Sequence, residues 1–133
     1  MKFSTEARSA KAQSYIDLIS GGFIRAYNGT KPTNPNTALA GNTLLGSIPL
    51  NTPAGTVTNG VATLDVTGAT DASADAAGTP TFCRIFKSDG TTAVIDLTAG
   101  VGSGECNFTA IIAAGAGLPL SSCVFTEPVG SDP

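Results

Sequence analysis

The amino-acid sequence predicts a mainly β protein, an antiparallel β-sandwich of about seven strands with one N-terminal helix. Three observations lead to this prediction. Apolar and polar residues alternate over most of the chain after Gly22, clusters of Gly, Pro, Asn and Asp separate the alternating runs, and only residues 4–20 carry a helical pattern. Half-exposed strands joined by short turns favour antiparallel sheets, and two such sheets bury their apolar faces against each other.

The length of 133 residues suits one domain with short extensions. We predict an N-terminal helix or arm at residues 1–21, a β-sandwich domain at 22–128 and a C-terminal tail at 129–133. A chain of this size buries roughly two-thirds of the surface that it exposes when unfolded, which is enough for a hydrophobic core.

The helix is expected between a polar cap and a pair of glycines. Ser4 or Thr5 can cap its N-terminus, Glu6 lies in the first turn where the helix dipole favours an acid, and the glycines at 21–22 end it. Its first half is mostly Ala and Ser, with few large apolar residues before Tyr15. Two interpretations remain open: the helix packs on the sheet, or it is an arm that docks on a neighbouring subunit.

The strands follow from period-two alternation and from the turns between them. Asn59-Gly60 is a turn signal, and Asp89-Gly90 between two β-branched or aromatic runs is the strongest hairpin signal in the chain. The segments 28–42 and 68–80 are expected to be exposed loops, and the Gly-rich segment 99–104 a plain connection. Strands are predicted at 23–27, 44–50, 62–67, 82–87, 92–97, 106–112 and 120–126.

The composition excludes several classes of function. Ala, Thr and Gly supply 53 of the 133 residues, and there is no His and no Trp. Without His the chain lacks the commonest general base and metal ligand, so it cannot by itself build a Ser-His-Asp or Cys-His centre. We therefore expect no enzyme activity, no catalytic residue, no cofactor and no metal.

Charge and hydropathy limit the classes of partner that we expect. The Lys and Arg residues are scattered and the isoelectric point is near 4.6, so no nucleic-acid partner is expected. No run of about 18 apolar residues occurs, so no membrane-spanning helix is expected. The first residues, MKFSTEARSAKAQSY, lack the apolar segment of a secretory signal, so we expect synthesis in a cytoplasm.

The three cysteines, Cys83, Cys106 and Cys123, leave two interpretations open. All three can be free, mostly buried thiols, as is usual in a reducing compartment. Alternatively, two of them form a disulfide, within one subunit or between subunits, after the protein reaches an oxidising setting, and one thiol is left over.

Two arginines lie inside apolar strands. Arg25 alternates with Phe23 and Tyr27, and Arg84 lies between Phe82 and Phe86. Either their charged ends reach solvent along apolar stems, or in an assembly they pair with acidic groups at an interface or with each other's loops.

Several segments taken together resemble a family of small phage and prophage virion proteins. After the helix, these segments are GGFIRAYNGTKP at 21–32, TLLGSIPL at 43–50, NGVATLDV at 59–66, AGTPTFCRIFKSDGTTAVIDL at 77–97 and SSCVFTEP at 121–128. The matching positions are Gly22, Arg25, Tyr27, Gly29, Pro32, Leu44, Leu45, Phe82, Arg84 and Gly90. The chain departs from the family pattern at Phe82, where Trp is more usual, and in its three cysteines.

The resemblance implies a structural part of a virus particle with no catalytic residues. The first expectation is a capsid decoration (cement) protein that binds and stabilises the shell of major capsid protein. It would form a homo-oligomer such as a trimer on the capsid surface of the virion, after synthesis in the host cytoplasm. The alternatives are a tail, baseplate or head-tail connector component, and a host-surface or carbohydrate-binding module.

Two segments are predicted to make the contacts with partners. They are the N-terminal segment 2–20 and the loop 28–42, and the expected contact residues are Phe3, Tyr15, Lys31 and Leu39. Apolar side chains at such positions can serve as anchors in a partner's surface.

Overall fold

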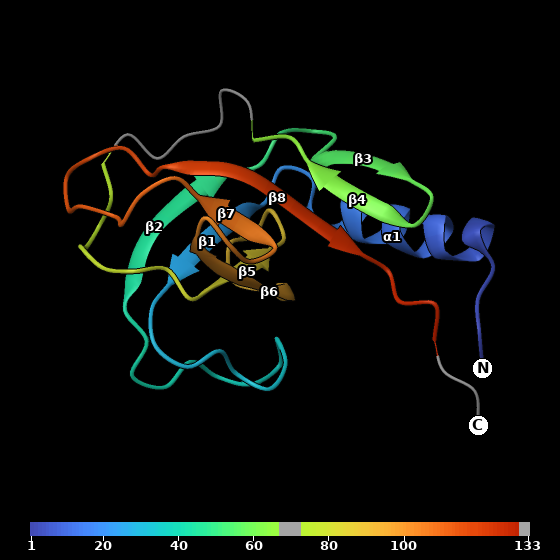
Figure 1. Cartoon of the computed structure of the whole chain (residues 1–133), viewed down its shortest axis with the longest axis horizontal. Coiled ribbons are helices and arrows are strands. Elements are labelled where there is room, and N and C mark those ends of the chain that lie inside the picture. Colours follow the sequence, from blue (N-terminus) through green and yellow to red (C-terminus); the bar gives the residue numbers. More distant parts are fainter. Residues whose placement is uncertain (67–72, 131–133) are drawn as a thin grey trace.

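The structure is a computed structural model that describes residues 1–66 and 73–130. These residues form one helix and eight strands, and the strands make a single curled, mixed sheet in the order β2-β1-β5-β6-β7-β8-β4-β3 (Figure 1). The elements are α1 (Thr5–Ile19), β1 (Phe23–Tyr27), β2 (Leu44–Pro49), β3 (Gly55–Thr58), β4 (Val61–Leu64), β5 (Phe82–Phe86), β6 (Ala93–Val101), β7 (Cys106–Phe108) and β8 (Leu120–Thr126).

The predicted mainly β class with one N-terminal helix is confirmed, but the predicted seven-stranded antiparallel sandwich is wrong. The strands do not divide into two stacked sheets, because β6 joins two antiparallel groups edge to edge. The first part of β6 pairs with β5 from Ala93 to Thr98, and its last part pairs with β7 from Ala99 to Val101. Much of the segment 99–104, predicted as a plain connection, is therefore strand.

The β6–β7 pair is parallel, which the sequence did not predict. Parallel neighbours usually need a connection of a dozen or more residues, yet only residues 102–105 separate these strands. Gly102 and Gly104 adopt φ values of +73° and +84°, which let the chain turn back within this short segment. The Glu105 carboxylate accepts hydrogen bonds from the N–H and hydroxyl of Thr98 at 3.1 and 3.2 Å and so closes the loop.

The strand β3 is the eighth strand, and the sequence pattern does not predict it. It pairs with β4 across a two-residue turn at Asn59 and Gly60, whose φ values are +52° and +79°. These values suit the Asn-Gly hairpin turn that the sequence indicates. The four residues before Asn59 carry no strand signal of their own, because Pro53 and Gly55 are residues typical of loops.

The helix α1 lies where the sequence placed it and shares the core with the sheet. The Ser4 hydroxyl accepts a hydrogen bond from the N–H of Ala7 at 3.1 Å, which confirms an N-cap, and Gly21 follows the last turn with a φ of +73°. Ala12, Ile16 and Ile19 are fully buried on the helix side that faces the sheet. The helix contacts β3, β4 and β6.

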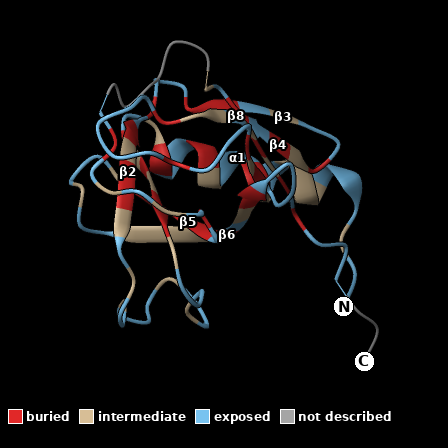
Figure 2. Cartoon of the chain, turned by 60° about the vertical axis from the view of Figure 1, so that its left-hand side comes forward, coloured by how far each residue is buried: buried red, intermediate tan, exposed pale blue. Residues whose placement is uncertain are grey.

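Buried residues line the inside of the curl and one side of α1 (Figure 2). The strand β5 is buried on both faces, unlike its neighbours. Its inner face joins the core, and part of its outer face lies under the loop 28–42. The predicted loop 68–80 and tail 129–133 fall partly outside the described residues, at 68–72 and 131–133, as does the last residue of the predicted strand 62–67.

Candidate interaction surfaces

The N-terminal segment makes contacts within the chain at two of the predicted contact residues. Phe3 is half-buried, and its N–H donates to the carbonyl of Val129 at 2.8 Å. The ammonium of Lys11 lies 3.7 Å from the centre of the Phe3 ring, a cation–π contact. Lys2 and Gly130 form an isolated β-bridge, so the two ends of the described chain lie side by side (Figure 1).

Tyr15 and its neighbours on α1 hold the segment that follows β8. The Tyr15 ring lies 6.3 Å from the ring of Phe125. Burial, together with a hydrogen bond to Glu127 and the charge of that carboxylate, raises the pKa of Tyr15. Glu127 is only 7% exposed; its carboxylate lies 3.2 Å from the Lys11 ammonium, and its carbonyl accepts from Arg8 Nε at 3.0 Å. This helix face is therefore occupied by the chain itself.

The loop 28–42 is built by asparagine side chains. Asn42 Nδ2 donates to the carbonyls of Asn28 and Thr30 at 2.7 and 3.1 Å, and Asn28 Oδ1 accepts from the N–H of Thr43 at 2.8 Å. These side-chain hydrogen bonds close the base of the loop. They take the place of the hydrogen bonds between strands, which end with β1.

The two predicted contact residues of this loop differ in exposure. Lys31 is exposed, and Leu39 is half-buried. Lys31 lies at a shallow groove of about 260 Å³, whose other lining residues include Pro32, Thr37 and Asn42. The loop therefore presents a basic side chain beside a small, mostly uncharged hollow, while Leu39 contributes only part of its surface.

Arg84 reaches neither solvent nor an interface. It is 4% exposed, and its Nε and Nη2 atoms donate to the two carboxylate oxygens of Asp96 on β6 at 2.8 and 3.0 Å. Nη2 also lies 3.3 Å from the carbonyl of Asn34, so the buried ion pair helps to hold the loop 28–42 over β5. The predicted solvent-facing guanidinium and interfacial acidic pair do not describe Arg84. The predicted contact with the loop that follows the strand of Arg25 does occur, within one chain rather than in an assembly.

Arg25 has a different environment on the same sheet face. It is half-buried, its Nη1 donates to the carbonyl of Gly90 at 2.8 Å, and its guanidinium lies 4.4 Å from the centre of the Phe86 ring. Arg25 and Arg84 are opposite each other in the β1–β5 register. Next to them in the same register, Tyr27 stacks on Phe82 with ring centres 5.3 Å apart.

The structure pairs two of the three cysteines. Cys106 on β7 and Cys123 on β8 are opposite each other in register and form a disulfide within the chain. Cys83 is free and fully buried in β5, and burial raises the pKa of its thiol to about 12. The pairing follows from strand register, which the spacing of cysteines in the sequence does not reveal.

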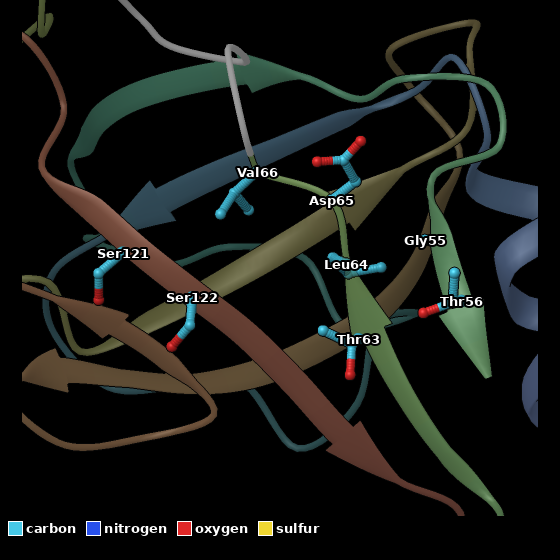
Figure 3. Close-up of a pocket in the computed structure, with 8 residues that line it drawn as sticks. All are labelled: Gly55, Thr56, Thr63, Leu64, Asp65, Val66, Ser121 and Ser122. Carbon is cyan, nitrogen blue, oxygen red and sulfur yellow. The ribbon is translucent and has the colours of Figure 1, made fainter. Parts of the chain in front are cut away.

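A shallow hollow of about 400 Å³ lies over β3, β4 and the start of β8. Its polar side chains are Thr56, Thr63, Asp65, Ser121 and Ser122. Figure 3 shows that these groups are spread across the strands and do not converge on one point. The Ser121 hydroxyl already donates to the carbonyl of Asn107 at 2.8 Å.

Sequence reasoning missed the exposed apolar loop between β7 and β8. Ile111 in this loop is 64% exposed, whereas the sequence predicts a strand over residues 106–112. One feature of the sequence indicates an apolar surface here, because residues 106–126 contain no charged residue.

Among residues 1–66 and 73–130, no three His, Cys, Asp or Glu side chains gather closely enough to hold a metal ion. In the same residues, no helix is long and apolar enough to cross a membrane. Comparison of the chain with protein-family models, curated proteins and solved structures found no match. The described residues thus define a small protein of one curled β-sheet and one helix.

Proposed function

We propose that this chain is a structural protein of a bacteriophage virion, and specifically a capsid decoration protein. It binds the shell of major capsid protein, stabilises it by contact as a homo-oligomer on the capsid surface, and needs no cofactor. The observation that carries the proposal is the sequence resemblance to small virion proteins, which extends from the helix to the last strand.

The positions that carry the resemblance are structurally connected, which supports the proposal. Arg25 and Arg84 are register neighbours, Tyr27 stacks on Phe82, and Arg25 donates to the carbonyl of Gly90. These residues brace one face of β1 and β5 and hold the loops beside it. A pattern that maintains a scaffold and its loops suits a protein that acts by binding.

The proposal is tested first by location and abundance. Virions made by the genome that encodes the chain are purified, and the stoichiometry of the chain is compared with that of the major capsid protein on a stained gel. A decoration protein is expected at a copy number comparable to that of the shell protein. A copy number far below that of the shell protein would favour a tail, baseplate or connector component.

The second test is direct binding to empty capsids. We expect the purified chain to co-sediment with purified capsids and to raise their temperature of disruption. Lys31→Glu, at the exposed groove of the loop 28–42, is expected to weaken binding, whereas the matched change Lys87→Glu in the β5–β6 connection is not. Failure to bind capsids, or binding of the isolated chain to glycans instead, would contradict the proposal.

A further inference from the structure

Three dipeptides of this chain belong to a class that rearranges without an enzyme. When Gly follows Asn or Asp, its unshielded backbone nitrogen can attack the carbonyl carbon of the preceding side chain, and the resulting ring opens to aspartate or isoaspartate. The other asparagines precede Thr, Pro or Phe, which shield the attacking N–H or, in the case of Pro, remove it. The three dipeptides are Asn28-Gly29, Asn59-Gly60 and Asp89-Gly90.

The structure protects two of these dipeptides, because each holds the attacking N–H in a hydrogen bond. The N–H of Gly60 donates to the hydroxyl of Ser9 at 2.9 Å, and the N–H of Gly90 donates to the carbonyl of Lys87 at 2.9 Å. Such a hydrogen bond must break before the nitrogen can react. At Asp89 the turn also lowers the pKa of the carboxyl to about 2, and the resulting carboxylate resists attack by a nucleophile.

The dipeptide Asn28-Gly29 lacks this protection. Within the described residues, the N–H of Gly29 has no hydrogen-bond acceptor, and Gly29 is exposed. On the other side of the reacting pair, Asn28 Oδ1 accepts from the N–H of Thr43 at 2.8 Å. This donor faces the oxygen on which negative charge develops when a nucleophile adds to Asn28 Cγ, so it favours the addition.

The fold requires both members of this dipeptide. Gly29 has a φ of +81°, and an added Cβ would lie 2.9 Å from Asn42 Nδ2. The same Nδ2 atom closes the base of the loop 28–42 through the carbonyls of Asn28 and Thr30. Asn28 also donates its N–H to the carbonyl of Thr43 at 3.3 Å. The contacts that build the base of the loop therefore maintain a reactive pair there.

We propose that Asn28 is a site of spontaneous deamidation, and that the product alters the base of the loop 28–42. The Gly29 amide gives its proton to a base, and its nitrogen forms a bond to Asn28 Cγ. The Cγ–Nδ2 bond breaks, and Nδ2 takes up a proton and leaves as ammonia, so a cyclic succinimide remains. One water molecule then adds to either carbonyl of the succinimide and opens it to aspartate or isoaspartate. No electron is transferred, and water is the only reagent consumed.

Both products change the loop. Each adds a negative charge to a segment whose only charged side chain is Lys31. Isoaspartate also inserts a methylene group into the main chain before Gly29, so residue 28 can no longer keep both of its hydrogen bonds with Thr43. The inference goes beyond the proposed function and does not depend on it, although the same loop is proposed there to contact the capsid.

The test follows the purified full chain during incubation at mildly alkaline pH, both folded and in concentrated urea. Peptide mapping by mass spectrometry measures conversion at each asparagine, and an isoaspartyl methyltransferase assay measures isoaspartate. In the folded chain we expect Asn28 to convert, at a rate that rises with pH, while Asn59 stays intact. In urea the two asparagines are expected to convert at similar rates, because unfolding removes the hydrogen bonds that distinguish them.

Two results of this comparison would overturn the inference. One is a folded chain in which Asn28 stays intact over a time in which the chain in urea converts. The other is a folded chain in which Asn59 converts as fast as Asn28. None of these measurements involves capsids, so a failure here is distinguishable from a failure of the proposed function.

The variant Ser9→Ala tests the protecting hydrogen bond, because it removes the acceptor of the Gly60 N–H and leaves Asn28 unchanged. We expect conversion at Asn59 to rise about fivefold, the equivalent of one hydrogen bond, and conversion at Asn28 to keep its rate. Circular dichroism establishes that the variant is folded. A folded variant in which Asn59 is as stable as in wild type would contradict this account of protection, and the wild-type comparison decides the matter if the variant does not fold.

The effect on the loop is measured on the converted chain, which anion exchange separates by its added negative charge. Hydrogen exchange at the N–H of Thr43 is expected to be faster in the isoaspartate form than in the unconverted chain. Equal exchange rates in the two forms would show that the base of the loop is unaltered and would overturn that part of the inference.

Discussion

Arg84 and Asp96 place two opposite charges inside a small protein. Their side chains are 5% and 2% exposed, and two parallel hydrogen bonds join them. Desolvating two charges is costly, and the gain from their attraction offsets that cost only when the geometry is good and the remaining donors are satisfied. Here the carbonyl of Asn34 receives a further bond from Arg84, so the pair fixes the loop 28–42 as well as the β5–β6 register.

Arg84→Ala is expected to lower the free energy of unfolding by about 3–5 kcal/mol, because it leaves the Asp96 carboxylate buried without its partner. The double variant Arg84→Met with Asp96→Leu is expected to recover most of that loss, since it removes both charges at similar volume. Urea unfolding followed by circular dichroism measures both. Equal losses in the single and double variants would contradict the role assigned to the ion pair.

The ionisation of Asp89 makes the stability of the β5–β6 turn depend on pH. Hydrogen bonds from the hydroxyl and N–H of Thr92 and from the N–H of Thr91 lower the pKa of the Asp89 carboxyl from 3.8 to about 2. Because the pKa is lower in the folded state than in the unfolded state, the carboxylate stabilises the fold above about pH 4. This contribution is lost as the pH falls from about 4 to about 2.

Asp89→Asn is therefore expected to be less stable than wild type at pH 7 and to show a smaller loss of stability on acidification from pH 4 to pH 2. Asp17→Asn on α1 makes the same change of charge outside the turn and serves as the control. Melting temperatures at a series of pH values provide the measurement. If Asp89→Asn and wild type have parallel profiles, the hydrogen-bonded turn does not contribute in this way.

At the scale of elements, the β6–β7 connection decides the topology. It turns the chain back within four residues, and Gly104 is the residue at which a side chain is least tolerated. A Cβ at this position would lie 2.8 Å from the Cα and carbonyl carbon of Ala99, and the φ of +84° is itself strained for an L-residue. The parallel pairing of Ala99–Val101 with β7 thus depends on a glycine.

Gly104→Ala is expected to lower the free energy of unfolding by about 2–4 kcal/mol, from the positive φ and the contact with the backbone of Ala99 together. Gly102→Ala is the matched control, because its φ is also positive but no atom lies within 4 Å of its added Cβ. It is expected to cost only about 1 kcal/mol. Thermal or chemical unfolding of both variants tests this difference, and equal costs would show that the close contact is relieved without penalty.

The elements themselves were largely predictable. The alternation around Phe23–Tyr27, the cap at Ser4 and the Asp89-Gly90 turn are local signals, and the structure confirms a strand, a helix and a hairpin there. The sequence does not predict the strand β3, because Gly55–Thr58 is only four residues long and begins two residues after Pro53. A strand this short carries too few alternating positions to be recognised without its partner.

At the scale of the whole molecule, the Cys106–Cys123 disulfide ties β7 to β8 and closes a loop of 17 residues along the chain. A cross-link of this span stabilises the folded state mainly by restricting the unfolded chain, by about 3 kcal/mol. Cys83 lies apart from it, fully buried.

Reduction of the disulfide is accordingly expected to lower the free energy of unfolding by about 3 kcal/mol. The double variant Cys106→Ala with Cys123→Ala is expected to be insensitive to reductant, whereas Cys83→Ala is expected to keep the full response. Unfolding with and without a phosphine reductant measures this, and a wild-type chain indifferent to reductant would contradict it. Non-reducing gels are expected to show no disulfide-linked dimer, because the paired cysteines belong to one chain.

The sequence by itself determined the mainly β class, the helix, most strands and the absence of histidine chemistry, because these depend on residue types and on local periodicity. Only the tertiary structure decided that the strands form one curled sheet, that Cys106 pairs with Cys123, and that Arg84 is buried with Asp96 while Tyr15 lies against Phe125. The physical reason is that alternation shows which residues share a face of a strand, whereas partners, register and burial are set by contacts between residues far apart in the chain.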